Sequence, residues 1–158
     1  MAQNDSLMPP PKLDGKGLRV GLVTARWNDE ITNRLLQGAQ QAIEECNINA
    51  SDVVHVWVPG AFEVPLGAKF LIDEKNVDLV VGLGAVIRGE TSHYDFVAGE
   101  CARGLMDVQL ITGVPVMFGV LTTENKQQAL ARSSDEDNKG YECLRGGVEM
   151  ALLAKGLR

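Results

Sequence analysis

The chain has 158 residues, of which 45 % are hydrophobic and 23 % are charged, so its length and composition fit one domain with a sizeable core. Its formal net charge of -6 and its isoelectric point near 4.9 argue against broad binding to nucleic acid or to anionic membranes, which requires a basic surface. Any phosphate group that the protein binds must therefore be held by local groups.

The N-terminal segment contains three successive prolines and no apolar stretch long enough for a signal sequence or a membrane span. We therefore expect a cytoplasmic protein with a flexible, proline-rich arm at residues 1–15 and a single domain at residues 16–158. The arm is either disordered or packed in an extended form against a neighbouring subunit, because ordering a proline-rich segment costs little conformational entropy.

Strands and helices alternate along the rest of the chain. Hydrophobic patterns predict strands at 18–25, 53–58, 77–87 and 116–122. Helices are expected after Asp29, from Pro65 to about Lys75, from Tyr94 to a stop at Gly113, around 127–132, and through Leu144, Val148, Ala151 and Leu152. Strict alternation implies right-handed parallel crossovers. We therefore predict an α/β fold, a three-layer αβα sandwich around a four-stranded parallel sheet.

The segment VDLVVGLGAVIRGETSHYDF, residues 77–96, carries the clearest functional signal. Its apolar run is typical of a central parallel strand buried on both faces. Ser92 and Asp95 have the spacing of a capping box at the start of the next helix. The amides and the positive end of that helix should face an anionic ligand beyond the strand.

Ligands of such sheets bind beyond the carboxyl ends of the strands, near the switch in strand order. This rule selects three loops, at 26–29, 59–64 and 88–93. In the third loop, the backbone amides of Gly89, Glu90 and Thr91 are suited to an anion. Arg88 either meets the ligand or forms a salt bridge, which is the more common role of an arginine at the end of a strand.

His93 lies at a strand-to-helix junction and suits a group that transfers protons near neutral pH, although it also fits a solvated first residue of a helix. His55 lies within a predicted strand and indicates a structural role. Two histidines without ligand-like spacing do not indicate a metal site. The three cysteines are widely spaced and odd in number, which favours buried reduced thiols (Cys46, Cys101 and Cys143).

Other candidates have two interpretations each. Trp27 either stacks on a planar ring or covers the core, and Glu63 either accepts hydrogen bonds from ring N–H groups or stabilises the first turn of a helix. Local sequence predicts that Phe118 belongs to the core. The same local evidence assigns Arg132 and Lys139, on either side of a polar break, to surface charge.

Together, these residues resemble lumazine synthase over nearly the whole chain. The resemblance is carried by TARWN at 24–28, VPGAFEVP at 58–65, GAVIRGETSHYDFV at 84–97, FGVLTTEN at 118–125 and NKGYE at 138–142. It implies a transferase that condenses 5-amino-6-(D-ribitylamino)uracil with 3,4-dihydroxy-2-butanone 4-phosphate. The products are 6,7-dimethyl-8-ribityllumazine, phosphate and water, at the penultimate step of riboflavin biosynthesis. We expect the fold to be flavodoxin-like, with strand order 2-1-3-4.

The resemblance also implies a role for each matching position. Those expected to bind the pyrimidine are Trp27, Ala61, Phe62, Glu63, Ala85, Val86, Ile87 and Phe118. Those expected to hold the butanone phosphate are Glu90, Thr91, Arg132 and Lys139. His93 would transfer protons. In the family, Phe118, Arg132 and Lys139 belong to the adjacent subunit, which would explain how a residue in mid-strand reaches a site at the ends of strands.

The implied reaction needs no redox cofactor or metal, and its shared sites need at least a pentamer. Some relatives build shells of sixty subunits, so the sequence leaves pentamer, decamer and capsid open. Two alternatives to the enzyme are a flavin- or pterin-binding protein on the same scaffold and a mainly structural shell protein. The presence of both His93 and Arg132 favours catalysis. Trp27 stands where phenylalanine is common in the family, which predicts riboflavin binding, and SSDEDNKG at 133–140 is shorter and more acidic than in relatives.

Overall fold

The computed structural model describes Met8 and residues 12–158. Its strands are β1 (Val20–Ala25), β2 (Val53–Val58), β3 (Leu79–Ile87) and β4 (Val116–Thr123). Its α-helices are α1 (Asp29–Glu45), α2 (Val64–Lys75), α3 (His93–Thr112), α4 (Lys126–Ala131) and α5 (Lys139–Gly156). Single turns of 3-10 helix precede β2 at Ala50–Asp52 and α2 at Ala61–Glu63.

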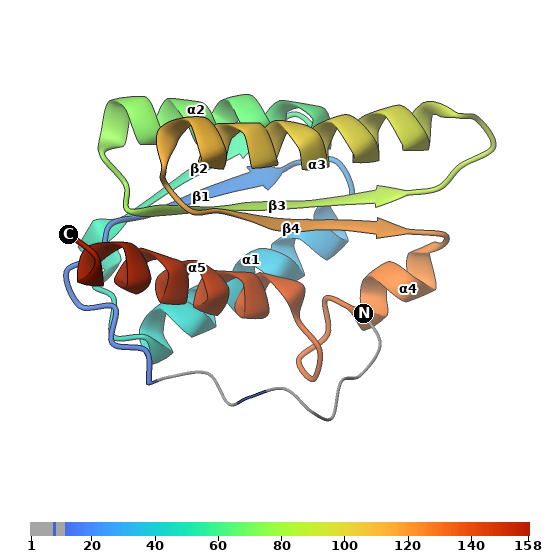
Figure 1. Ribbon diagram of the computed structural model, residues 1–158. Helices are drawn as coiled ribbons and strands as arrows, with labels where there is room; N and C mark the ends of the chain where they lie inside the picture. Colours follow the sequence, from blue (N-terminus) through green and yellow to red (C-terminus); the bar gives the residue numbers. More distant parts are fainter. Residues whose placement is uncertain (1–7, 9–11) are drawn as a thin grey trace.

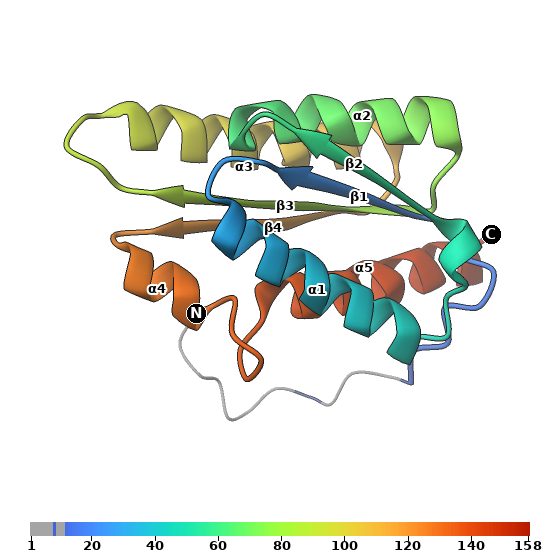
Figure 2. The same cartoon turned by 180° about the vertical axis from the view of Figure 1, so that it is seen from behind.

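The four strands form one parallel sheet in the order β2-β1-β3-β4, which confirms the predicted α/β fold and strand order. Helices α2 and α3 cover one face, whereas α1, α4 and α5 lie on the other (Figure 1 and, from behind, Figure 2). The strand order places β1 and β3 in the middle and leaves β2 and β4 as edges. The carboxyl ends of all four strands therefore meet at one side of the sheet, where the β1 and β3 loops begin.

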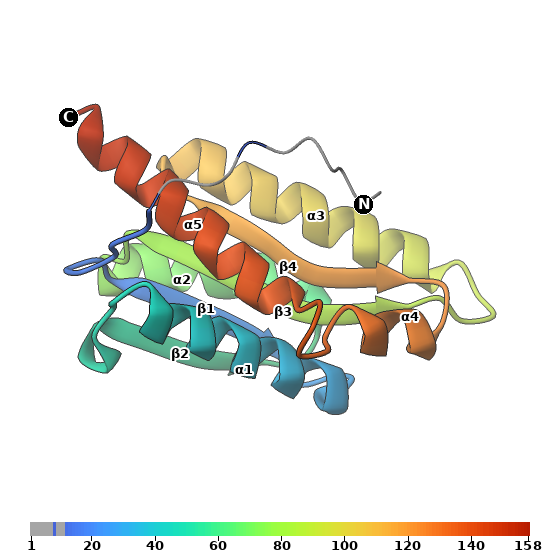
Figure 3. The same cartoon turned by 90° about the horizontal axis from the view of Figure 1, so that it is seen from below.

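Each face of the sheet has its own hydrophobic core. Buried side chains of α1 and α5 meet one face, including Leu35, Ala39 and Val148. The other core lies under α2 and α3 and includes Leu71 and Leu105. Every residue of β3 except the last is buried, as a central parallel strand requires. Figure 3 shows α1 and α5 lying across the sheet.

The predicted arm falls mostly outside the described residues, since 1–7 and 9–11 are not among them. Its last residues contact the domain. Leu13 belongs to the core beside α1, and the amide of Gly15 donates to the carbonyl of Cys46 at 2.7 Å. The division at residue 15 and the mobility of the arm remain predictions.

The predicted capping box at the start of α3 was wrong. Ser92 has φ -69° and ψ -2°, which is helical rather than the extended conformation of a side-chain cap, and its side chain caps no amide. The carboxylate of Asp95 instead accepts a hydrogen bond from Arg88 at 3.2 Å. Arg88, at the end of β3, thus binds the carboxylate that a capping box would use.

A methyl group at Gly140 should disrupt the contact between α1 and α5. A Cβ atom added there would collide with the carbonyl oxygen of Leu35, which belongs to the backbone and cannot rotate away. We expect Gly140→Ala to lower the free energy of unfolding by about 1–3 kcal/mol, measured by urea denaturation. Gly156→Ala on the same helix is the matched control, because a Cβ there meets open space. Equal stability of the two variants would contradict the packing described.

Candidate functional site

A cavity of about 740 Å³ opens at the carboxyl ends of the central strands. It is formed by the three loops that the sequence selected. Its walls are Trp27, Asn28, Pro59, Gly60, Ala61, Phe62, Glu63, Ala85, Val86, Ile87, Gly89, Thr91, His93, Tyr94, Phe96 and Val97. Most of the wall is apolar or aromatic, including Phe96 and Val97 of α3, and its polar side chains are those of Asn28, Glu63, Thr91 and His93, with the hydroxyl of Tyr94.

The turn between β1 and α1 is shaped by Asn28. This residue adopts the left-handed conformation, with φ 63° and ψ 49°, which asparagine tolerates better than most residues. Its side-chain amide donates to the carbonyl of Ala85 at 2.8 Å and so ties the turn to β3. Trp27, immediately before it, lies at the rim of the cavity with 74 % of its surface exposed. The sequence prediction did not include Asn28, although an asparagine between a strand and a helix indicates such a turn.

The second loop brings an aromatic side chain and a carboxylate to the cavity. The amide of Trp27 donates to the carbonyl of Pro59 at 3.2 Å, which joins the first two loops. The following 3-10 turn carries Ala61, which is buried, and Phe62, which is 60 % exposed. Glu63 completes that turn and lines the cavity, as the sequence predicted for this loop.

The third loop presents unpaired backbone donors beside a histidine. Among the described residues, the amides of Gly89, Glu90 and Thr91 have no hydrogen-bond acceptor, so they are free to bind an anion. His93 is the first residue of the 20-residue helix α3, and its own amide donates to the Thr91 hydroxyl at 3.4 Å. The positive end of α3 adds to the field at this point. Glu90 is exposed and is not part of the cavity wall.

Arg88 takes the structural role that the sequence left open. Its guanidinium donates to Glu124 at 3.0 Å and to Asp95 at 3.2 Å, and it lies over the ring of Tyr94. The guanidinium therefore binds two carboxylates, and Arg88 does not line the cavity.

The other histidine and the cysteines are structural. A ring nitrogen of His55 lies 2.9 Å from the hydroxyl of Thr24, and burial lowers the pKa of this histidine. Burial also raises the pKa of Cys101 to about 12 and that of Cys143 to about 11, which keeps both as thiols. All three cysteines are free, as predicted, but only Cys46 and Cys101 are buried, whereas Cys143 is partly exposed.

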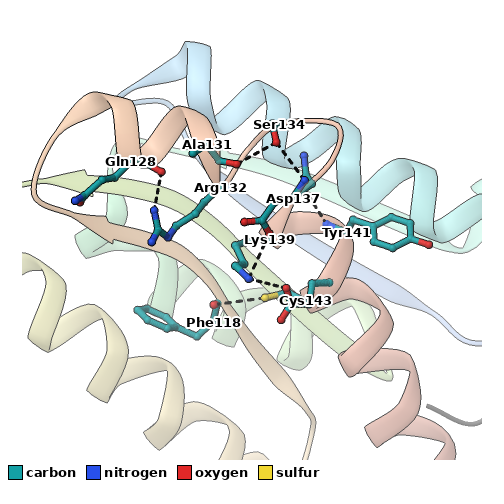
Figure 4. Close-up of polar contacts among 11 residues, drawn as sticks. Phe118, Gln128, Ala131, Arg132, Ser134, Asp137, Lys139, Tyr141 and Cys143 are labelled. Atoms are coloured by element: carbon teal, nitrogen blue, oxygen red, sulfur yellow. Dashed lines mark hydrogen bonds and ion pairs between the residues drawn. The ribbon is translucent and has the colours of Figure 1, made fainter. Parts of the chain in front are cut away.

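Three predicted site residues lie elsewhere in the chain. Phe118 belongs to β4, Arg132 directly follows α4, and Lys139 is the first residue of α5 (Figure 4). The prediction that Phe118 belongs to the core was wrong, because β4 is an edge strand and 41 % of this side chain is exposed. Arg132 donates to the carbonyl of Gln128 at 3.1 Å.

Lys139 is held by acidic neighbours from the same segment. Its ammonium pairs with Glu142 at 2.7 Å and with Asp137 at 3.5 Å. The hydrogen bond with Glu142 raises the pKa of Lys139 despite partial burial. These contacts join the acidic segment to the first turn of α5 and leave Lys139 charged.

A second cavity, of about 780 Å³, lies between α1 and the segment 133–138. None of the predicted site residues lines it, and its walls are mostly polar side chains such as Arg34, Gln37 and Gln41. Of its described wall residues, Tyr141 is the one aromatic residue, and none is a histidine. The first cavity is therefore the better candidate for chemistry.

Within residues 12–158 and Met8, no group of three His, Cys, Asp or Glu side chains could hold a metal ion. No helix in the described part of the chain is long and apolar enough to cross a membrane.

The fold and the cavity define an α/β enzyme whose site, at the carboxyl end of a parallel sheet, suits a planar molecule next to an anionic one. A family model for 6,7-dimethyl-8-ribityllumazine synthase matches residues 17–155. The chain therefore belongs to this family of transferases in riboflavin biosynthesis. Membership implies two small-molecule substrates and assembly as a homo-oligomer.

Proposed function

We propose that the protein condenses 5-amino-6-(D-ribitylamino)uracil with 3,4-dihydroxy-2-butanone 4-phosphate. The observation that carries this proposal is the cavity itself, in which an apolar, aromatic wall with one carboxylate faces free amides and a histidine. The amide end is suited to the phosphate, and the opposite wall to the pyrimidine.

The pyrimidine is assigned to the wall formed by Trp27, Phe62, Glu63 and the end of β3. Ala61, Ala85, Val86 and Ile87 provide apolar surface around the ring. The carboxylate of Glu63 is placed to accept hydrogen bonds from ring N–H groups, which confer orientation and specificity in an otherwise apolar pocket.

The butanone phosphate is assigned to the loop between β3 and α3. The amides of Glu90 and Thr91 would donate to its phosphate oxygens, with the positive end of α3 adding to the attraction. Because these contacts come from the backbone, the negative side chain of Glu90 can remain in solvent.

The second half of the site is assigned to a neighbouring subunit. Phe118 would close over the pyrimidine, while Arg132 and Lys139 would approach the phosphate. This assignment is supported by the exposed aromatic side chains at both places, Trp27 and Phe62 at the cavity and Phe118 beside β4. An interface that joins the two would cover all of them. Large apolar side chains are also exposed on α3, at Met106, Leu110 and Ile111, and indicate a further buried contact.

We propose a head-to-tail pentamer, the smallest assembly that the resemblance to lumazine synthase implies, in which every cavity receives a neighbour's residues. Such a head-to-tail arrangement closes into a ring and leaves no unpaired half-site. Light scattering distinguishes a pentamer from a decamer or a sixty-subunit capsid. A monomer at working concentrations would contradict the shared site.

The reaction begins when the amine of the uracil attacks the ketone and loses water to form an imine. Loss of the proton from C3 then expels inorganic phosphate as the C4–O bond breaks, and the enol that results tautomerises to a ketone at C3. The ribitylamino nitrogen finally attacks this new ketone, and a second water leaves as the ring closes. His93 would carry protons between these nitrogen, carbon and oxygen atoms, and bound phosphate would orient the ketone.

The decisive experiment mixes the purified protein with both substrates and follows lumazine absorbance and phosphate release. Product formation well above the spontaneous background, with phosphate released in equal amount, supports the proposal. Product at the background rate would contradict it and favour a binding protein on the same scaffold.

Riboflavin binding at the cavity rim is a second expectation, favoured by the large exposed ring of Trp27. Riboflavin fluorescence should be quenched on titration with protein. We expect Trp27→Ala to weaken the binding about five- to tenfold, because stacked aromatic pairs contribute about 0.5–1.5 kcal/mol beyond their burial. Trp27→Phe should retain part of the affinity. Identical titrations for the three proteins would contradict stacking on Trp27.

A further inference from the structure

We propose that Arg88 is a positioning residue that holds the phosphate-binding loop in shape without touching the substrate. This inference rests on the proposed function, because it assigns the loop at 89–92 to the butanone phosphate. The interactions of Arg88 define a clamp, which consists of Arg88, Tyr94, Asp95 and Glu124.

The clamp joins three segments of the chain at one point. The amide of Arg88 donates to the carbonyl of Thr123 at 2.9 Å, and its Nε donates to Oε2 of Glu124 at 3.0 Å. These two bonds fix the end of β3 to the end of β4. Its Nη1 donates to Oδ1 of Asp95 at 3.2 Å, which fixes the same guanidinium to the first turn of α3. Both ends of the loop are therefore anchored by one side chain.

The clamp also reaches the cavity wall. The guanidinium carbon of Arg88 lies 4.2 Å from the centre of the Tyr94 ring, and Tyr94 lines the cavity. A guanidinium over an aromatic face is an attractive arrangement that limits the ring's freedom. Arg88 thus shapes the wall next to His93 while lying outside it.

The loop between the anchors has little structure of its own. Residues 89–92 are all exposed. Among the described residues, the polar contacts that hold them locally are those of the Thr91 hydroxyl with the His93 amide, at 3.4 Å, and of the Ser92 carbonyl with the Asp95 amide, at 3.0 Å. A loop with so few contacts loses conformational freedom when its amides converge on an anion. Anchoring it in advance removes part of that cost.

The charge of Arg88 is used by the clamp rather than by the ligand. Two carboxylates neutralise the guanidinium, and direct contact with a phosphate would require these ion pairs to break. The partners are well exposed, at 60 % for Asp95 and 61 % for Glu124, and exposed pairs contribute little to global stability. The effect of the clamp should therefore appear locally, as order in the loop and affinity for phosphate.

The test combines steady-state kinetics with hydrogen exchange, measured by mass spectrometry on peptides that cover 88–95. We expect Arg88→Met to raise KM for the butanone phosphate about three- to tenfold, the range for one lost ion-pair network, and to leave KM for the uracil within about twofold. Without ligand, the hydrogen-bonded amides at positions 88, 93 and 95 should exchange faster in Arg88→Met than in the wild type. Arg88→Lys keeps the positive charge and should therefore give smaller changes than Arg88→Met. It should not restore wild-type values, because an ammonium cannot match the fork that holds two carboxylates.

Two further variants make the outcome specific. Glu124→Gln weakens one side of the clamp and should shift both readouts in the same direction as Arg88→Met. Arg103→Met is the matched control, because Arg103 also pairs with two carboxylates, Glu100 and Asp107, but lies within α3 away from the loop. Unchanged exchange of the amides at positions 88, 93 and 95 in Arg88→Met, or a loss confined to kcat, would overturn the proposal.

The exchange experiment also separates this inference from the proposed function. Inorganic phosphate serves as the probe, and it should protect the loop amides of the wild type at lower concentrations than those of Arg88→Met. This result supports the clamp even if the wild type makes no lumazine. Equal protection of both proteins by phosphate would overturn the clamp even if the wild type is a fully active synthase.

Discussion

Replacing His93 with alanine should lower kcat by about two to four orders of magnitude, the contribution of one general acid–base group. His93 begins α3 at the cavity, beside the free amides of the loop. There it can transfer protons during imine formation, phosphate elimination and ring closure. Because the backbone amides and the aromatic wall remain, both KM values should change much less than kcat.

Single-turnover mixing followed by lumazine absorbance measures this effect, since it separates chemistry from product release. His55→Gln is the control, because His55 bonds to Thr24 within the sheet and is not part of the cavity. Its single-turnover rate should match that of the wild type. An unchanged rate in His93→Ala would remove this histidine from the mechanism.

The fold was predictable because its signals are local and strong. The apolar, glycine-containing run of β3 is typical of a strand buried on both faces, and Gly113 ends α3 with φ 72°, as a left-handed stop requires. The alternation of strands and helices predicted a parallel sheet, in which the loops that follow the strands lie at the same edge. Nine of the predicted site residues consequently line one cavity: Trp27, Ala61, Phe62, Glu63, Ala85, Val86, Ile87, Thr91 and His93.

The errors came from contacts and strand positions that local residue spacing does not reveal. The spacing of Ser92 and Asp95 indicates a capping box, but it contains no information about Arg88, which takes the carboxylate. Asn28 was missed because its bond to Ala85 spans 57 residues. Phe118 was assigned to the core because an apolar strand pattern does not reveal whether the strand lies in the middle or at the edge. The place of Phe118, Arg132 and Lys139 in the site depends on a second chain, which local sequence does not encode.

Arg132 provides the second large effect and a direct test of the shared site. Arg132→Ala should reduce kcat/KM for the butanone phosphate about ten- to a hundredfold, because hydrogen bonds to charged groups contribute about 1.5–3 kcal/mol. In the single chain, Arg132 lies beside β4 and contacts the carbonyl of Gln128, outside the cavity that contains His93. If the neighbour's Arg132 completes each site, then His93 and Arg132 of one site come from different subunits and can be replaced separately.

Refolding equal amounts of His93→Ala and Arg132→Ala subunits together should restore activity. Random assembly joins an intact His93 to an intact neighbouring Arg132 at about one quarter of the sites, so about a quarter of the wild-type rate is expected. An equal mixture of wild type and the double variant provides a second test. We expect about one quarter of the wild-type rate if the site is shared between subunits, but about one half if it lies within one chain. Oligomers mixed only after assembly serve as the control and should show no gain. A mixture of single variants no more active than the average of its parents would place both residues in the site of one subunit.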